Sequence, residues 1–287
     1  MGERRLYGVL LVTAGTALWS LAGLFVRAID LGLWDLVFWR SVFAGLCLIA
    51  IALARPGEAT RFGWPGCLAA GLSAAAMFCY IAALTLTTVA NVLIIYATLP
   101  FVTAALAWTI GREVASRRLL VASTLSLAGI GLVAGTSLTA TDIAGNMLAF
   151  AMTVSFGALL IVTRRQRSLN IVHVNAAGAA LCAAAVFPFS SGRLPEIDAL
   201  VLIFLLALLT TALAFLLFLA GGRHVASSES ALIALLDVVL GPLWVWMAFA
   251  EDPGRGAVSG GSIVIASVAW YFWPSLRRSW TSRRAVR

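Results

Sequence analysis

The residues from Phe62 to Gly111 include no charged side chain over 50 positions, which constrains the fold more than any other feature of the chain. A helix crosses the hydrocarbon core of a bilayer in about 20 residues, so this interval is too long for one span and fits two. The 287 residues as a whole are 62% hydrophobic and only 11% charged, whereas soluble domains carry about 25% charged residues. The sequence therefore predicts a membrane protein and excludes soluble enzymes, disordered chains and nucleic-acid-binding modules.

Division of the apolar intervals by this length predicts ten transmembrane helices. The long interval supplies the third and fourth helices, joined near residues 85–88. The other eight are predicted at Leu6–Val26, Leu33–Ala54, Leu119–Thr141, Ile143–Thr163, Ser168–Gly192, Ala199–Gly222, Ala226–Ala250 and Gly256–Leu276. The first of these is too long for the core of a signal peptide and lacks a clear cleavage site, so we expect it in the mature protein.

The distribution of basic residues predicts the orientation in the membrane. All 20 are Arg, and with ten spans both termini lie on one side, together with 16 of them. Only Arg27, Arg193 and Arg255 fall on the other side, and Arg40 lies inside the second span. Because cytoplasmic loops carry the excess of basic residues, both termini are predicted to be cytoplasmic.

The two halves of the sequence resemble each other at a nearly fixed offset. At shifts of 137 or 138 residues the aligned pairs include Trp19 with Phe156, Tyr80 with Phe218, Asn91 with Glu229, and Glu113 with Glu251. Each half carries five helices, an odd number, so the second copy must enter the membrane from the opposite side. We therefore predict an all-α polytopic membrane protein with two inverted five-helix repeats, residues 1–141 and 142–287, around a central cavity.

Four segments carry a resemblance to a known family. They are Leu18-Trp19-Ser20 in the first span, FWRSVFAG in the second, TTVANVLIIYATLP in the fourth and SSESALIALLDVVLGPLWVWMAFAEDP in the ninth. In these segments the chain resembles the drug/metabolite transporter superfamily, and within it the EamA-type exporters, over essentially its whole length. Many relatives have Glu-Pro where this chain has Asp237-Val238. The resemblance implies a cargo of small organic metabolites or amino acids and no prosthetic group.

Asp237 is the most deeply placed charged residue, near the middle of the ninth span. Charged groups at this depth are costly, so each needs a reason. Ser230, Asp237 and Trp244 recur every seven residues along one helix face, with Glu229 beside it, and we expect this face to line the cavity. Asp237 either binds a cationic group of the substrate, with or without proton exchange, or ties helices together as a structural contact.

Two other charged residues have structural explanations. Glu229 lies in the first turn of the ninth span, where a carboxylate suits the positive end of a helix, and a cavity-lining role together with Asn91 is the alternative. Arg40 lies within reach of the membrane surface and of Asp30 or Asp35. This position favours structural pairing over the attraction of an anionic ligand.

Aromatic side chains occupy repeat-related positions in four spans, and rings so placed predict walls around an apolar or aromatic cargo, with ordinary packing as the alternative. Ser20, beside Trp19, would allow the backbone to approach the substrate closely. The predicted substrate-binding residues are Trp19, Ser20, Tyr80, Asn91, Phe156, Phe218, Glu229, Asp237 and Trp244.

The sequence favours a secondary transporter that exports amino acids or related small metabolites across the inner membrane of a bacterium by alternating access. We expect no catalytic residue, since the chain has no clustered His and Asp at a membrane surface. The four Cys and two His lack metal-ligand spacing, and without a P-loop motif ATP does not drive the protein directly. We therefore expect that the protein is not an enzyme. The alternatives to a transporter are a membrane-embedded lipid-modifying enzyme and a channel.

The predicted partners are a small-molecule substrate and the lipid bilayer, with no nucleic acid and no cofactor. Runs of Gly, Ala and Ser occur in the fifth and tenth spans, for example at residues 123–135 and 259–267. Such runs suit close helix packing, which can stabilise either the scaffold or a homodimer.

Overall fold

The computed structural model describes residues 2–54, 62–86, 92, 95–111, 116–134, 143–249 and 254–284. Over these ranges the chain is helical and has no strand. Seven helical segments are long and apolar enough to span a membrane, and Leu99–Ile110 and Val258–Trp273 are shorter apolar helices. Together with α7 (Arg117–Ala134) they make up the ten spans expected from the sequence.

The first repeat contains spans one to five. Its helices are α1 (Gly2–Trp19), α2 (Ala22–Ala28), α3 (Leu33–Ala54), α4 (Gly63–Leu86), α6 (Leu99–Gly111) and α7 (Arg117–Ala134). A short turn at Ser20 and Leu21 separates α1 from α2, and the two together form the first span. Residues 92 and 95–98 and helix α6 represent the fourth span.

The second repeat contains spans six to ten. Its elements are α8 (Ile143–Arg165), α9 (Ile171–Val186), η1 (Phe187–Phe189), α10 (Ile197–Leu206), η2 (Ala207–Leu213), α11 (Ala214–Gly222), α12 (Ser227–Ala234), α13 (Asp237–Phe249) and α14 (Gly254–Arg284). The element η2 is a π-helix, a wide turn in the middle of the continuous eighth span. The ninth span consists of two helices, α12 and α13, instead of the single helix expected from the sequence.

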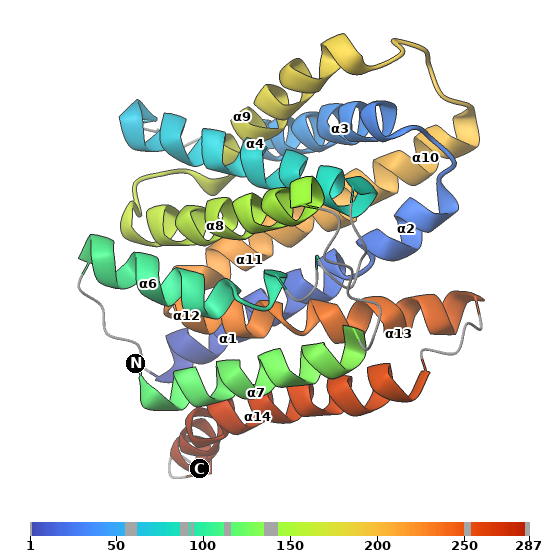
Figure 1. The fold of residues 1–287 in the computed structure, drawn as a ribbon. Helices are drawn as coiled ribbons and strands as arrows, with labels where there is room; N and C mark the ends of the chain where they lie inside the picture. Colours follow the sequence, from blue (N-terminus) through green and yellow to red (C-terminus); the bar gives the residue numbers. More distant parts are fainter. Residues whose placement is uncertain are drawn as a thin grey trace.

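The two repeats are interleaved (Figure 1). The fifth and tenth spans, α7 and α14, lie side by side at one edge of the bundle, and the second and seventh spans, α3 and α9, at the opposite edge. The third span, α4, packs on the sixth, α8. The repeat-related pair packs in the same way, with α11 of the eighth span on α1 of the first. In addition α6 packs on α12. These contacts are those expected when a pseudo-two-fold axis relates the halves.

Glycines allow the closest of these contacts. A Cβ at Gly129 of α7 would lie 2.7 Å from the carbonyl oxygen of Gly260 in α14. A Cβ at Gly15 of α1 would lie 2.8 Å from the backbone nitrogen of Phe218 in α11. The small residues of the fifth and tenth spans therefore pack against each other within one chain. The homodimer stays a prediction.

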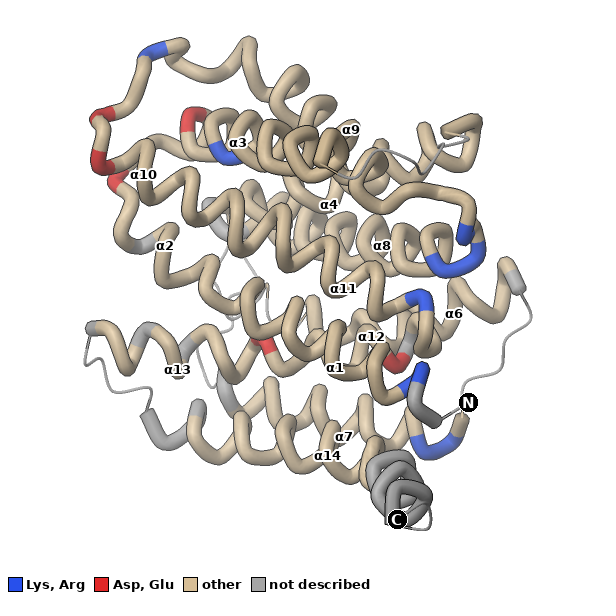
Figure 2. Tube along the Cα trace, turned by 180° about the vertical axis from the view of Figure 1, so that it is seen from behind, with Lys and Arg blue, Asp and Glu red and all other residues tan. Residues whose placement is uncertain are grey.

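Charged residues gather at the two ends of the bundle (Figure 2). Arg residues follow or begin the helices at one end, where Arg165 donates to Ile110 O, Arg167 to Arg223 O and Arg223 to Leu169 O. Acidic residues dominate the other end, near the start of α3 and of α10. We call these the basic end and the acidic end.

Candidate functional site

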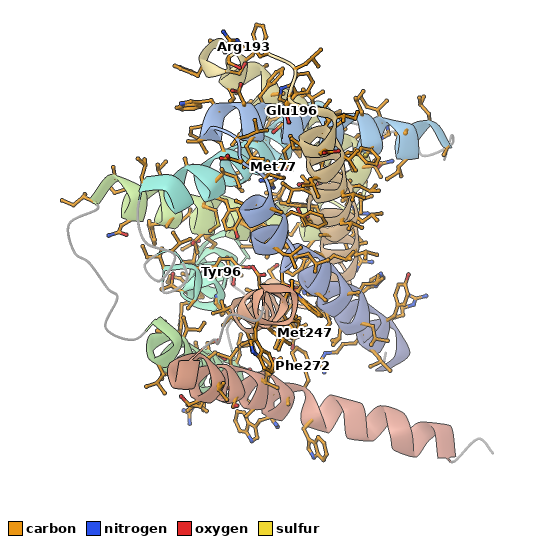
Figure 3. All side chains as sticks on the ribbon, turned by 90° about the vertical axis from the view of Figure 1, so that its right-hand side faces the viewer. Met77, Tyr96, Arg193, Glu196, Met247 and Phe272 are labelled. Atoms are coloured by element: carbon orange, nitrogen blue, oxygen red, sulfur yellow. The ribbon has the colours of Figure 1, made fainter. Side chains whose placement is uncertain are left out.

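A small cavity lies between the two repeats, and both repeats supply its walls. The first repeat contributes Trp19, Arg40, Ala76, Met77, Tyr80, Val92 and Tyr96, and the second contributes Met152, Phe156, Phe215 and Asp237. Figure 3 shows Met77 and Tyr96 among the helices of the bundle, whereas Arg193 lies at its margin. The volume of about 30 Å³ holds about one or two water molecules, so the cavity is nearly closed in this conformation.

Aromatic rings form one wall of this cavity. The ring centroid of Trp19 lies 4.9 Å from that of Phe156 and 4.8 Å from that of Phe215. Phe218 joins the same cluster, 5.9 Å from Trp19 and 5.5 Å from Phe156. Edge-to-face and tilted contacts of this kind hold the rings in place, so the wall is prearranged.

Asp237 reaches the cavity because the ninth span breaks beside it. Helix α12 ends at Ala234, a turn occupies Leu235 and Leu236, and Asp237 is the first residue of α13. In the turn Leu236 N donates to Ile233 O, a spacing of three residues where an α-helix has four. A carboxylate at the start of α13 is favoured by the positive end of the helix dipole.

The fourth span breaks at the equivalent place. Ala97 and Thr98 form a turn before Leu99 begins α6, and a shift of 138 residues places them on Leu235 and Leu236. Leu99 thus holds the position of Asp237 in the first repeat. Broken helices that meet at the bilayer midplane are a feature of substrate sites in secondary transporters.

The carboxylate of Asp237 lies near the middle of the ninth span, and the residues that the structure describes do not saturate it. It comes ten residues after Ser227, about 15 Å along the helix, which is half the thickness of a hydrocarbon core. Among the residues that the structure describes, none forms a hydrogen bond or an ion pair with it. Tyr80 and Tyr96 line the same cavity as Asp237.

Arg40 lines the same cavity, contrary to the pairing with Asp30 or Asp35 expected from the sequence. It is only 5% exposed, and its Nε donates to Thr211 Oγ1 at 2.9 Å. Asp35 instead accepts a hydrogen bond from Ser191 N at 2.8 Å. The expectation was wrong because the arginine side chain points into the bundle toward the π-helix η2 and does not reach the acidic end.

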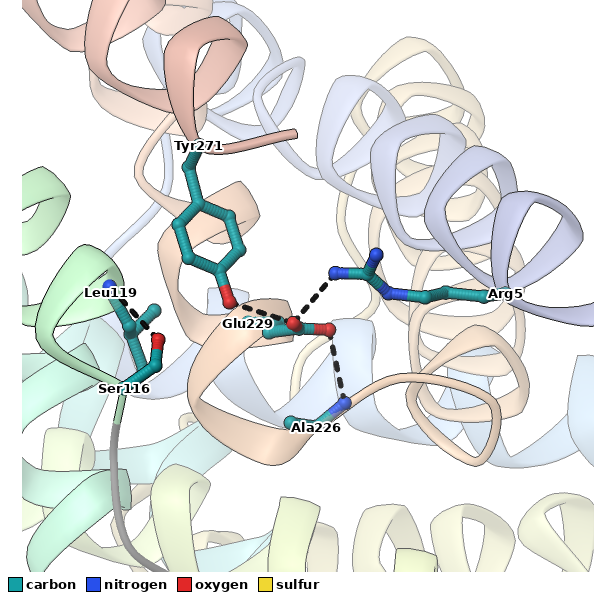
Figure 4. A network of polar contacts seen from close by, with 6 residues as sticks. All are labelled: Arg5, Ser116, Leu119, Ala226, Glu229 and Tyr271. Atoms are coloured by element: carbon teal, nitrogen blue, oxygen red, sulfur yellow. Dashed lines mark hydrogen bonds and ion pairs between the residues drawn. The ribbon is translucent and has the colours of Figure 1, made fainter. Parts of the chain in front are cut away.

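Glu229 lies at the basic end, outside the residues that line the cavity, and its carboxylate is fully engaged (Figure 4). Its Oε1 accepts from the Arg5 guanidinium at 2.8 Å and from the Tyr271 hydroxyl at 2.7 Å. Its Oε2 faces Ala226 N at 3.4 Å. These contacts join α1, α12 and α14, in agreement with the structural interpretation of Glu229 and against a cavity-lining role.

Three further residues of the predicted site do not line the cavity. Trp244 Nε1 donates to Ser20 Oγ at 2.7 Å, so these two side chains join α13 to the turn between α1 and α2 outside the cavity lining. Phe218 lies behind Trp19 and Phe156, because α11 is pressed against α1 at Gly15. Asn91 lies outside the described residues.

The prediction missed several residues that line the cavity. Phe215 lines the cavity where Phe218 was expected. Two signals in the sequence indicate Phe215: it lies one helical turn before Phe218, and a shift of 138 residues aligns it with Met77, which also lines the cavity. Tyr96 directly precedes the break in the fourth span. The structure brings together Trp19, Tyr80, Phe156 and Asp237 from the predicted set.

Comparison with known proteins agrees with this architecture. No functionally curated protein matches the sequence significantly. One solved structure, described as "Crystal structure of protein", superposes with a TM-score of 0.82 at 19% sequence identity, over 94% of this chain and 98% of that chain. At this identity the likeness shows the fold alone. The sequence model of the EamA-like transporter family matches twice, at residues 6–135 and 143–273. The chain therefore belongs to the EamA-like transporter family, within the drug/metabolite transporter superfamily, and carries two copies of its repeat.

Proposed function

We propose that this protein is a secondary transporter that exports amino acids or related small metabolites by alternating access. The supporting observation is the central cavity, whose walls come from both repeats and which lies beside the break in each of two equivalent spans. When one repeat rocks against the other, a site at their junction opens to one side of the membrane and then to the other.

The charges at the two ends support an orientation with both termini in the cytoplasm. The basic end carries Arg5 and the Arg residues that follow α8, whereas Arg193 lies near Asp35 and Trp39 at the acidic end. Under the positive-inside rule the basic end is cytoplasmic, and the membrane is the inner membrane of a bacterium. Export then means movement from the basic end to the acidic end.

The size of the cavity supports a carrier over a channel. A channel needs a continuous wet pathway across the membrane. A space of about 30 Å³ is too small for an amino acid, so the helices must move before substrate enters. Such movement is the expected behaviour of a carrier that alternates between two open states.

Counterflow in proteoliposomes tests the proposal. Liposomes with the purified protein are loaded with unlabelled phenylalanine or leucine and diluted into a trace of the same radiolabelled amino acid. A carrier accumulates label transiently above equilibrium, and protein-free liposomes are the control. Uptake that is the same with empty and loaded proteoliposomes would indicate a channel, and chemical conversion of a lipid component would indicate an enzyme.

A further inference from the structure

Two residues of opposite charge line the cavity and form no ion pair with each other. Arg40 comes from the first repeat and Asp237 from the second, and both line the same space. The ion pair found among the described residues is that of Arg5 with Glu229 at the basic end, not one between Arg40 and Asp237. Tyr80 lines the same cavity as both of these residues.

Within the described part of the chain, neither residue has all of its hydrogen-bonding capacity used by the protein. Arg40 uses Nε on Thr211 Oγ1, and within the described part of the chain its terminal NH2 groups have no hydrogen-bond partner. Arg40 as a whole residue is only 5% exposed. A buried charge without a partner is costly. Arg40 is therefore suited to an anionic group of a ligand, and Asp237 to a cationic one.

From this arrangement we infer that the cavity binds a zwitterion, with Arg40 holding the carboxylate and Asp237 the ammonium group of an α-amino acid. The planar guanidinium matches a carboxylate with two parallel N–H donors, and Asp237 accepts from the ammonium. The Tyr80 hydroxyl can bond with either charged group. A single zwitterion then neutralises both Arg40 and Asp237 and leaves the site without net charge.

The same cavity defines the side chain of this amino acid. Its other walls are the rings of Trp19, Phe156 and Phe215 and the thioethers of Met77 and Met152. These surfaces favour an uncharged, apolar side chain, and methionines adapt to different shapes when the cavity widens. Amino acids with charged side chains would bring an extra buried charge that has no partner.

The inference rests on the proposed function, and it is tested by equilibrium binding, which does not require transport. Isothermal titration of the purified full-length protein compares three ligands with one side chain: phenylalanine, phenethylamine, which lacks the carboxylate, and 3-phenylpropanoate, which lacks the ammonium. Leucine, 3-methylbutylamine and 4-methylpentanoate form a second set. We expect each amino acid to bind at least about tenfold more tightly than either analogue, since each analogue leaves one buried charge unpaired.

Two variants should change the preference in opposite directions. Asp237→Asn should weaken the amino acid and the amine but not the carboxylate, and Arg40→Gln should weaken the amino acid and the carboxylate but not the amine. The matched control is Asp35→Asn, the same chemical change as Asp237→Asn on a carboxylate at the acidic end, which should keep the wild-type order. A merely structural role of either charge would lower all three affinities together.

The outcomes separate this inference from the proposed function. An amino acid that binds no more tightly than its amine or carboxylate analogue overturns the zwitterion site, as does the absence of binding by both sets. Counterflow of a solute that is not a zwitterion would then still support the carrier. Zwitterion binding with crossed preferences but without counterflow would instead keep the site and reject the carrier. The wild-type comparison needs no variant, so it decides even if a substitution prevents folding.

Discussion

Glu229 and Asp237 lie in the same span, eight residues apart, and their surroundings are opposite. Glu229 is held by Arg5, Tyr271 and the backbone of Ala226, at the end of the bundle. Asp237 has no such partner in the described structure and opens into the cavity. One carboxylate is saturated by the protein, whereas the other has no partner among the described residues. In this span the depth of a carboxylate and the number of its described partners point the same way: the residue at the end of the bundle has three partners, and the deep residue has none.

The largest expected effect follows from removal of the unsaturated charge. Asp237→Asn keeps size and hydrogen bonding, and we expect counterflow to fall by about 10- to 100-fold, since a hydrogen bond to a charged group contributes about 1.5–3 kcal/mol. Thermal stability should stay the same or rise, because an unpaired buried charge is removed. Rates per reconstituted protein and melting in detergent measure the two effects. Wild-type transport by this variant would reduce Asp237 to a structural contact.

The second effect concerns the saturated charge and should appear in stability, not in ligand binding. Glu229→Gln weakens the contacts with Arg5 and Tyr271, which we expect to lower the free energy of unfolding by about 1–3 kcal/mol. Arg5 is 35% exposed, so solvent screening limits its share. A double-mutant cycle with Arg5→Gln measures the coupling of the pair. A change of ligand preference in Glu229→Gln would contradict the assignment.

A smaller effect is expected for Tyr271→Phe, which removes one donor to Glu229 and leaves the ring in place. The loss should be about 1–2 kcal/mol of stability. In the background of Glu229→Gln the same substitution should cost less, because the charge that strengthens the bond is absent. Thermal melting of the four proteins provides the test, and equal losses in both backgrounds would show that the charge of Glu229 does not strengthen the bond.

The smallest effect is expected for the neutral contact of Trp244 with Ser20. Trp244→Phe or Ser20→Ala should lower stability by about 1 kcal/mol, the usual contribution of a neutral hydrogen bond. Both variants should transport within about twofold of wild type, since neither residue lines the cavity. A loss of transport as large as that of Asp237→Asn would place Trp244 or Ser20 in the substrate pathway instead.

The features of the fold that depend on hydrophobicity along the chain could be predicted. Ten spans, their repeat and the midplane position of Asp237 follow from the lengths of apolar intervals and from matched polar residues. The break at Leu235 and Leu236 could not, because both residues are apolar and hydropathy contains no signal for a turn. Pro100, the second residue of α6, does mark the equivalent break in the first repeat.

The direction in which a side chain points around the helix axis could not be predicted from the sequence. The sequence gives the depth of Arg40 along its helix. Depth alone does not distinguish a side chain that extends to the membrane surface from one that points to Thr211. Phe218 and Phe215 differ by three residues on one helix face, and the close approach of α1 at Gly15 decides which ring borders the cavity. Such choices depend on contacts between segments far apart in the sequence.

The π-helix η2 sets the helical phase of the eighth span. Before it, Ile203 and Leu206 pack with Ala22, Ile29 and Leu36, and after it Phe215 borders the cavity. Because the wide turn accommodates a residue more than an α-helix would, it acts as a one-residue insertion within the span. Deletion of one residue from 207–213 would restore α-helical phase and rotate the later side chains by about 100°. A relative whose eighth span lacked this wide turn would therefore need a one-residue gap inside the span before the same helix faces aligned.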